Sequence, residues 1–200
     1  MTPQEIFILF KNQQGSDHIA GKVTIEAVVS FCKKHNPQNI LELGGGIGTL
    51  SYAILKNCDG ALDIYEHNDF CIRALNDNLR EMSKRYTVTT DYLKLPPQRE
   101  YDLIIIDGGK GKGIYDGGFP QVIASYISSL NSIGTIFIEG RRKSQRFWVA
   151  EALRARFLYT PTHYEDPTGG KKGALRLDCK PCSNEFLRTM GHLYWRKRIY

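Results

Sequence analysis

Five carboxylates stand at or beside the carboxyl ends of apolar, β-branched stretches of this chain, where a side chain can meet a ligand: Glu42, Glu66, Asp91, Asp107 and Glu139. The first of them opens the pattern ExGxGxG, in which the glycines allow a ligand to approach the backbone closely. A carboxylate before such a turn repels a pyrophosphate but attracts a positive charge, directly or through water. We therefore expect a ligand that carries a cation.

The glycine pattern does not fit a nicotinamide dinucleotide site. That fingerprint, GxGxxG, requires a third glycine, but Thr49 fills the position counted from Gly44 and Ser51 fills it counted from Gly46. The dinucleotide interpretation fails in both frames.

Two further acids suit a nucleoside. Glu66 ends the second apolar stretch, twenty residues after Gly46, where a carboxylate accepts hydrogen bonds from a ribose diol. Asp91 follows the third stretch, where it could reach an exocyclic amine of an adenine.

The elements that would position these residues alternate between strand and helix patterns. Strands are predicted at 39–43, 61–66, 86–91, 101–107 and 134–140, and helices at 24–35, 49–57, 69–85, 119–130 and 145–157. The helix at 24–35 is expected to open on an imperfect capping box at Thr24. Two more strands, 157–165 and 174–180, are joined directly by a Gly-Gly turn, which makes the last strand antiparallel. The fold class is therefore α/β, a doubly wound, mostly parallel sheet of seven strands with helices on both faces.

Length and composition indicate one domain. The chain has 200 residues, 42% of them hydrophobic, and it divides into an N-terminal lid or helix (1–38), a Rossmann-like core (39–181) and a helical tail (182–200). In the tail, Phe186, Met190, Leu193 and Tyr194 share a face that we expect to dock on the domain itself. No run approaches the ~20 apolar residues that cross a bilayer, so no membrane partner is expected.

The five cysteines are odd in number and fall among elements predicted to be buried. They indicate reduced thiols in a cytoplasmic protein rather than a disulfide framework. Cys179 and Cys182 form a lone CxxC without a second ligand pair, so no metal site is expected.

Taken together, these motifs resemble the class I S-adenosylmethionine-dependent methyltransferase family, over about residues 24–181. The resemblance is carried by ELGGGIG (42–48), YEHN (65–68), TDY (90–92) and YDLIIIDGGK (101–110). It implies S-adenosyl-L-methionine as cofactor, with Glu42 near its methionine end, Glu66 on its ribose, and Asp91 and Tyr92 beside its adenine. The other cofactor-side positions within these motifs are Gly44, Gly45, Gly46, Gly48, His67 and Asp107.

The fourth strand and its loop are similar to those of the small-molecule O-methyltransferase branch. Asp107 and Glu139 are the candidate general bases for a hydroxyl acceptor, and Lys110 could orient the acceptor or lower its pKa. The Asp-Asn pair with which some members of the branch hold a divalent metal is missing, because the fifth strand ends in Glu139, Gly140 and Arg141. We therefore predict no metal.

Basic residues of three loops crowd the expected substrate side, and the formal net charge is +6. Lys112, Arg141 and Arg142 are the candidate substrate-binding residues, and they favour a small anionic oxygen acceptor. The alternative is an RNA or protein methyltransferase that uses the same basic rim to bind its polymer, and such a rim could hold RNA phosphates. A non-catalytic cofactor-binding or scaffold protein is a further alternative, and a homo-oligomer is compatible with the sequence.

Overall fold

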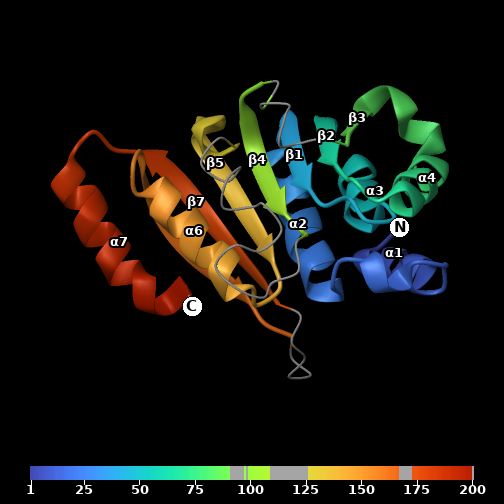
Figure 1. Cartoon of the computed structure of the whole chain (residues 1–200), viewed down its shortest axis with the longest axis horizontal. Coiled ribbons are helices and arrows are strands. Elements are labelled where there is room, and N and C mark those ends of the chain that lie inside the picture. Colours follow the sequence, from blue (N-terminus) through green and yellow to red (C-terminus); the bar gives the residue numbers. More distant parts are fainter. Residues whose placement is uncertain (91–96, 98, 109–125, 167–172, 200) are drawn as a thin grey trace.

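One sheet of seven strands organises the chain, for which the computed structural model describes residues 1–90, 97, 99–108, 126–166 and 173–199. The strand order is β3-β2-β1-β4-β5-β7-β6, and β7 is antiparallel to both of its neighbours (Figure 1). The strands are β1 (Asn39–Leu43), β2 (Ala61–Tyr65), β3 (Tyr86–Thr89), β4 (Tyr101–Ile106), β5 (Leu130–Glu139), β6 (Phe157–Tyr164) and β7 (Ala174–Pro181). The predicted fold class is confirmed.

The helices form two layers, one on each face of the sheet (Figure 1). Helices α1 to α4 pack on one face, and α6 and α7 pack on the other. Their bounds are α1 (Pro3–Lys11), η1 (Ser16–His18), α2 (Lys22–His35), α3 (Thr49–Leu55), α4 (Asp69–Asn78), η2 (Arg80–Arg85), α6 (Lys143–Leu153) and α7 (Glu185–Ile199). None of the helices in the described ranges is long and apolar enough to cross a membrane.

The central strands are apolar on both faces because helices cover both. In β4, Leu103 and Ile105 face the layer of α1 to α4, whereas Ile104 and Ile106 face the layer of α6 and α7. All four side chains are at most 2% exposed. This burial explains the continuous apolar run, which is typical of a parallel strand inside a sheet.

Four predicted helices have different limits in the structure, namely α2, α3, α4 and α6, and the differences at α2 and α4 have a clear local cause. Helix α2 begins at Lys22, with Gly21 in extended conformation as its N-cap, so Thr24 is a buried residue inside the helix and not a cap. The predicted helix 69–85 ends at Asn78 and continues as the 3₁₀ segment η2. Met82, with φ −112° and ψ 16°, interrupts the helical backbone there.

The C-terminal helix α7 has the predicted helical conformation but buries a different face. Phe186, Met190, Leu193 and Tyr194, the expected docking face, are 50–70% exposed. Instead, His192 and Ile199 are buried against the domain. The prediction that the apolar stripe docks on the chain's own domain is therefore wrong, because amphipathicity identifies a face but not what covers it.

The predicted Gly-Gly turn between β6 and β7 falls on residues 167–172, which lie outside the described residues. Tyr164 pairs with Ala174, so residues 165–173 form the connection. The two strands nevertheless form the expected antiparallel pair, with eight paired positions between Phe157 and Tyr164.

The order of the strands brings the predicted site residues to one edge of the sheet. β1 lies between β2 and β4 and pairs with both in parallel, and β4 also pairs in parallel with β5. The carboxyl ends of these four strands therefore lie side by side. In such sheets the crevice at this edge is where ligands bind.

Candidate functional site

The glycine turn after β1 is held tightly against the rest of the chain. Gly44, Gly46 and Gly48 have φ values of 94°, 52° and 89°, which residues with side chains rarely adopt. A Cβ on Gly44 would lie 2.1 Å from the carbonyl oxygen of Asp107, and one on Gly46 would lie 2.2 Å from that of His18. The glycines are therefore required by the packing of the chain itself, whether or not a ligand binds there.

Glu42 is completely buried at this turn, although it is an acid. Ser51 on α3 donates from Oγ to Glu42 Oε2 over 2.5 Å, while Oε1 has no hydrogen-bond partner among the described residues. Burial raises the pKa of Glu42 well above its ordinary value, and the negative charges of Asp107 and Glu66 raise it further. A positive charge near this cluster would reverse that effect.

Glu66 follows β2 and is 7% exposed. Its Oε2 accepts from Gly46 N at 2.8 Å, and its Oε1 accepts from His67 N at 2.8 Å and from Asn68 N at 2.9 Å. The imidazole of His67 is exposed, with Nδ1 3.8 Å from Glu66 Oε1. Glu66 thus fixes the glycine turn to the end of β2. Because a carboxylate oxygen has two acceptor sites, Oε2 can still accept a further donor such as a ribose hydroxyl.

A second group of charges lies at the ends of β4 and β5. The guanidinium Nη2 of Arg142 is 3.3 Å from Glu139 Oε2 and 3.9 Å from Asp107 Oδ1, and its Nη1 donates to the Gly108 carbonyl over 2.5 Å. The amide nitrogen of Gly21, at the start of α2, lies 3.4 Å from Glu139 Oε1. Arg142 therefore sits between the two candidate bases and is not free to bind a substrate anion unless these contacts open.

Exposure distinguishes the two candidate bases. The side chain of Asp107 is 14% exposed and that of Glu139 is 8% exposed. Arg141, next to Arg142 in the chain, is exposed. Of the two acids, Asp107 is the easier one for a bound molecule to reach.

Four predicted site residues, Asp91, Tyr92, Lys110 and Lys112, lie outside the described residues. The others gather in two neighbouring groups. Glu42, Glu66 and the glycine turn form the first, Glu139 and Arg142 form the second, and Asp107 interacts electrostatically with Glu42 of the first and Arg142 of the second.

Sequence reasoning did not predict three contacts that shape the site. Ser51 orients Glu42, the backbone of His18 packs on Gly46, and Gln145 donates from Nε2 to Gly108 O over 2.5 Å. Only Ser51 left a signal in the sequence, because it lies within the first turn of the helix that follows the glycines.

The charges around the turn suit a cationic cofactor. Three carboxylates influence one another electrostatically there, and one buried carboxylate oxygen lacks a partner within the described residues. Across the described ranges, no group of three or more His, Cys, Asp or Glu side chains is arranged to hold a metal ion. The donor set therefore suits a ligand with a sulfonium or ammonium group.

Similarity to other proteins is visible at the level of the fold. No protein-family model and no curated protein sequence matches the chain. An O-methyltransferase from Bacillus cereus, in complex with S-adenosylhomocysteine, superposes with a TM-score of 0.70 at 14% identity, covering 89% of this chain and 90% of that one. An O-methyltransferase of tomaymycin synthesis from Streptomyces achromogenes, in complex with S-adenosylmethionine, gives 0.65 at 14% identity, covering 89% and 87%.

A methyltransferase with a polymeric substrate is also similar. The ribosomal protein L11 methylase from Lactobacillus delbrueckii subsp. bulgaricus gives a TM-score of 0.61 at 13% identity, covering 84% of this chain and 81% of that one. At such identities the shared feature is the architecture. The chain has the fold of the S-adenosylmethionine-dependent methyltransferases.

Proposed function

We propose that the chain is an S-adenosylmethionine-dependent methyltransferase whose acceptor is a small anionic molecule with a reactive oxygen. The observation that carries the proposal is the cluster of Glu42, Glu66 and Asp107 around the glycine turn. On a methyltransferase fold, this cluster provides negative charge where the cofactor's sulfonium and ammonium groups would lie.

The donor half of the proposed site consists of β1, β2 and the glycine turn. Glu66 would accept from the ribose hydroxyls while it keeps its bond from Gly46. Glu42 would act through the charge that it gains when the cation binds rather than by direct contact, because it is enclosed and bonded to Ser51. S-adenosylmethionine supplies an electrophilic methyl group with a good leaving group, so the protein's main task is to align the acceptor and exclude water.

The acceptor half lies at the ends of β4 and β5. Asp107 is the proposed base that takes the proton from an acceptor hydroxyl, because it is more exposed than Glu139. Arg142 holds both carboxylates in place through its contacts at 3.3 and 3.9 Å. Arg141, which is exposed at the same rim, is the proposed contact for the acceptor's negative charge.

Two measurements test this proposal. Calorimetric titration with S-adenosylmethionine and S-adenosylhomocysteine should show saturable binding, and a labelled methyl donor should label small molecules of a nuclease-treated cell extract. Absence of binding at millimolar concentrations of both compounds would overturn the donor assignment. Binding without labelling of any acceptor, unaffected by D107N and E139Q, would instead support a non-catalytic cofactor-binding protein.

A polymeric acceptor is the second candidate, supported by the net charge of +6 and by the similarity to the ribosomal protein methylase. Steep salt dependence of heparin retention, with label lost on nuclease treatment, would favour RNA. Label lost on protease treatment would favour a protein acceptor.

A further inference from the structure

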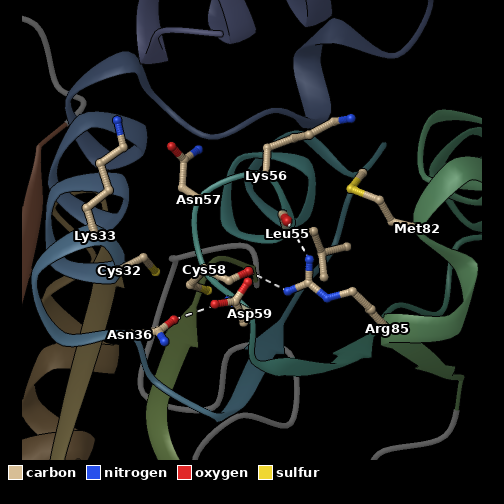
Figure 2. Close-up of a pocket in the computed structure, with 10 residues that line it drawn as sticks. All are labelled: Cys32, Lys33, Asn36, Leu55, Lys56, Asn57, Cys58, Asp59, Met82 and Arg85. Carbon is tan, nitrogen blue, oxygen red and sulfur yellow. Dashed lines mark hydrogen bonds between the residues drawn. The ribbon is translucent and has the colours of Figure 1, made fainter.

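A cavity lies at the opposite edge of the sheet from the glycine turn. It has a volume of about 760 Å³ and is bordered by the ends of α2 and α3 and by η2 (Figure 2). Cys58 precedes β2, so strand β2 (Ala61–Tyr65) separates this cavity from Glu66. The residues that line it include two cysteines and three basic side chains: Cys32, Cys58, Lys33, Lys56 and Arg85.

The two cysteines come from different elements but meet in this cavity. Cys32 is in the last turn of α2, and Cys58 is in the segment after α3. Both side chains line the cavity, as Figure 2 shows, and their thiols interact electrostatically. When protonated, Cys58 can also donate to Ile54 O, 3.4 Å away. Both cysteines are free in this structure.

Their interaction makes the two sulfurs chemically unequal. Interaction with the Cys32 thiol is the main cause that lowers the pKa of Cys58 to about 7, whereas the same interaction and burial raise the pKa of Cys32. Cys58 is also the more exposed of the two, at 7% against 0% for Cys32, so it is the sulfur that favours the thiolate and that a small molecule reaches first. A nucleophilic thiolate beside a protonated thiol is the arrangement that redox-active cysteine pairs use.

The charges around the pair favour the thiolate at Cys58. The Arg85 guanidinium donates to the carbonyls of Leu55, Cys58 and Gly60, and its positive charge lowers the pKa of Cys58, whereas Asp59 opposes it. Lys33 and Lys56 extend away from the two sulfurs in Figure 2. Arg85 is thus the cation that acts on this sulfur.

The other cysteines differ from this pair. Burial raises the pKa of Cys71 to about 11 and also raises that of Cys179, so both are protonated at neutral pH. Cys182 is more exposed than the other four. The oxidation rate of Cys182 therefore shows how fast a cysteine reacts when solvent exposure alone decides its reactivity.

We propose that Cys32 and Cys58 form a peroxide-oxidisable pair in which Cys58 is the attacking and Cys32 the resolving cysteine. The Cys58 thiolate attacks one oxygen of hydrogen peroxide, the O–O bond breaks, and hydroxide leaves, which gives Cys58 sulfenic acid. The Cys32 sulfur then attacks the Cys58 sulfur and the S–O bond breaks. The Cys32 proton and the departing hydroxide form water, and the two electrons lost by the sulfurs have reduced the peroxide. A low-molecular-weight thiol reverses the reaction by exchange.

This disulfide would join the end of α2 to the segment that leads into β2. It would cross-link the layer of α1 to α4 at the edge opposite the proposed methyl-transfer site, so the oxidation and the cofactor can be measured separately. The inference does not depend on the proposed function.

The test oxidises the full chain with a small excess of hydrogen peroxide, blocks the remaining thiols, and maps the peptides by mass spectrometry. We expect a 32–58 disulfide that appears at least several-fold faster than any oxidation of Cys182, and that dithiothreitol removes. In C32S, a dimedone adduct should accumulate on Cys58. In C58S, Cys32 should stay reduced, and C71S is the matched control that should behave like the unmodified chain.

Experiments on the unmodified chain alone can overturn the proposal, so the test remains decisive even if a variant fails to fold. Oxidation of Cys182 before Cys58, or disulfides that link two chains in place of the 32–58 bond, would show that exposure governs the chemistry. Full alkylation of both cysteines after peroxide treatment would show that the pair is not oxidisable.

Discussion

Ser51 Oγ lies 2.5 Å from Glu42 Oε2, and this hydroxyl is the one partner that the described residues give to a completely buried carboxyl group. The helix that follows the glycine turn thus holds an acid in place under the proposed cofactor site. Such an acid is unfavourable for the empty fold, because burial opposes its ionisation. This relationship suggests a site that trades stability for affinity.

We expect E42Q to stabilise the fold at neutral pH. The pKa of Glu42 is raised in the folded state, so its contribution to stability is complete below the unfolded pKa of about 4.3 and is lost as the pH rises toward the folded pKa. The free energy of unfolding should therefore increase in E42Q by ~1–3 kcal/mol at pH 7 and change less at pH 4. Urea denaturation at both pH values measures this, with S51A as the control that removes the hydroxyl but keeps the acid.

The same substitution, E42Q, should weaken cofactor binding although it stabilises the fold. A cationic ligand favours the ionised form of Glu42, so binding of S-adenosylmethionine should release protons and strengthen as the pH rises. Calorimetry in buffers of different ionisation enthalpy detects the protons. Equal affinity and equal proton release in E42Q would count against a role for Glu42.

E66Q should weaken S-adenosylmethionine binding by ~1.5–3 kcal/mol for each charge-assisted hydrogen bond that is lost. The amide can still accept at one atom, but Glu66 now accepts from three backbone N–H groups, so the turn itself should loosen. Calorimetry gives the affinity, and D69N is the matched control, because Asp69 is a nearby exposed acid that is not a proposed cofactor contact. Unchanged affinity in E66Q would remove the ribose assignment.

Arg141 and Arg142 should differ although they are adjacent. R141E should impair turnover of an anionic acceptor and leave cofactor affinity unchanged, because Arg141 is exposed. R142Q should reduce the maximal rate more than acceptor affinity, since it releases Asp107 and Glu139 from their shared cation. Steady-state kinetics with saturating cofactor separate the effect on the maximal rate from the effect on acceptor affinity. Identical effects of both substitutions would contradict the assignment.

G44A should destabilise the fold more than G140A. Both residues have positive φ, 94° and 72°, so both substitutions introduce backbone strain of ~1–3 kcal/mol. An added Cβ at Gly44 would also lie 2.1 Å from Asp107 O, whereas at Gly140 its nearest contact is Arg142 Cγ at 3.8 Å. The difference in unfolding free energy between the two variants measures the cost of the contact between the added Cβ and Asp107 O. An equal loss of unfolding free energy in both variants would mean that the glycine turn can shift to relieve this contact.

Acidification should loosen the docking of α7. His192 is buried, its Nδ1 is 2.8 Å from Tyr159 Oη and its Nε2 is 3.1 Å from Glu151 Oε1. Burial is the main cause that lowers the pKa of His192, so the stability it gives is present above the unfolded pKa of about 6.5 and is lost as the pH falls through the folded pKa. Hydrogen exchange of α7 between pH 7 and pH 5 should show this in the natural chain, and H192Q should abolish the dependence.

The sheet could be predicted because its strands have strong local signals. Runs such as LIII in β4 are apolar on both faces, and the acids at the strand ends follow directly from the strand positions. Helix limits were harder to predict. The start of α2 depends on Gly21 in extended conformation, and no side-chain cap marks it.

The ion pairs of the site could not be predicted, because they depend on how separate loops meet. The sequence indicated that Arg142 belongs to the substrate rim, but not that Asp107 and Glu139 neutralise it. It also indicated that the glycines make room for a ligand, whereas the backbone of Asp107 and of His18 occupies that space at two of them.

The strand order has a consequence for variation in the chain. β1 and β2, with Glu42 and Glu66, come from the first third of the chain, whereas β4 and β5, with Asp107 and Glu139, come from later segments and join along the single β1–β4 seam. Changes in the later segments would therefore alter the proposed acceptor half while leaving the proposed donor half in place.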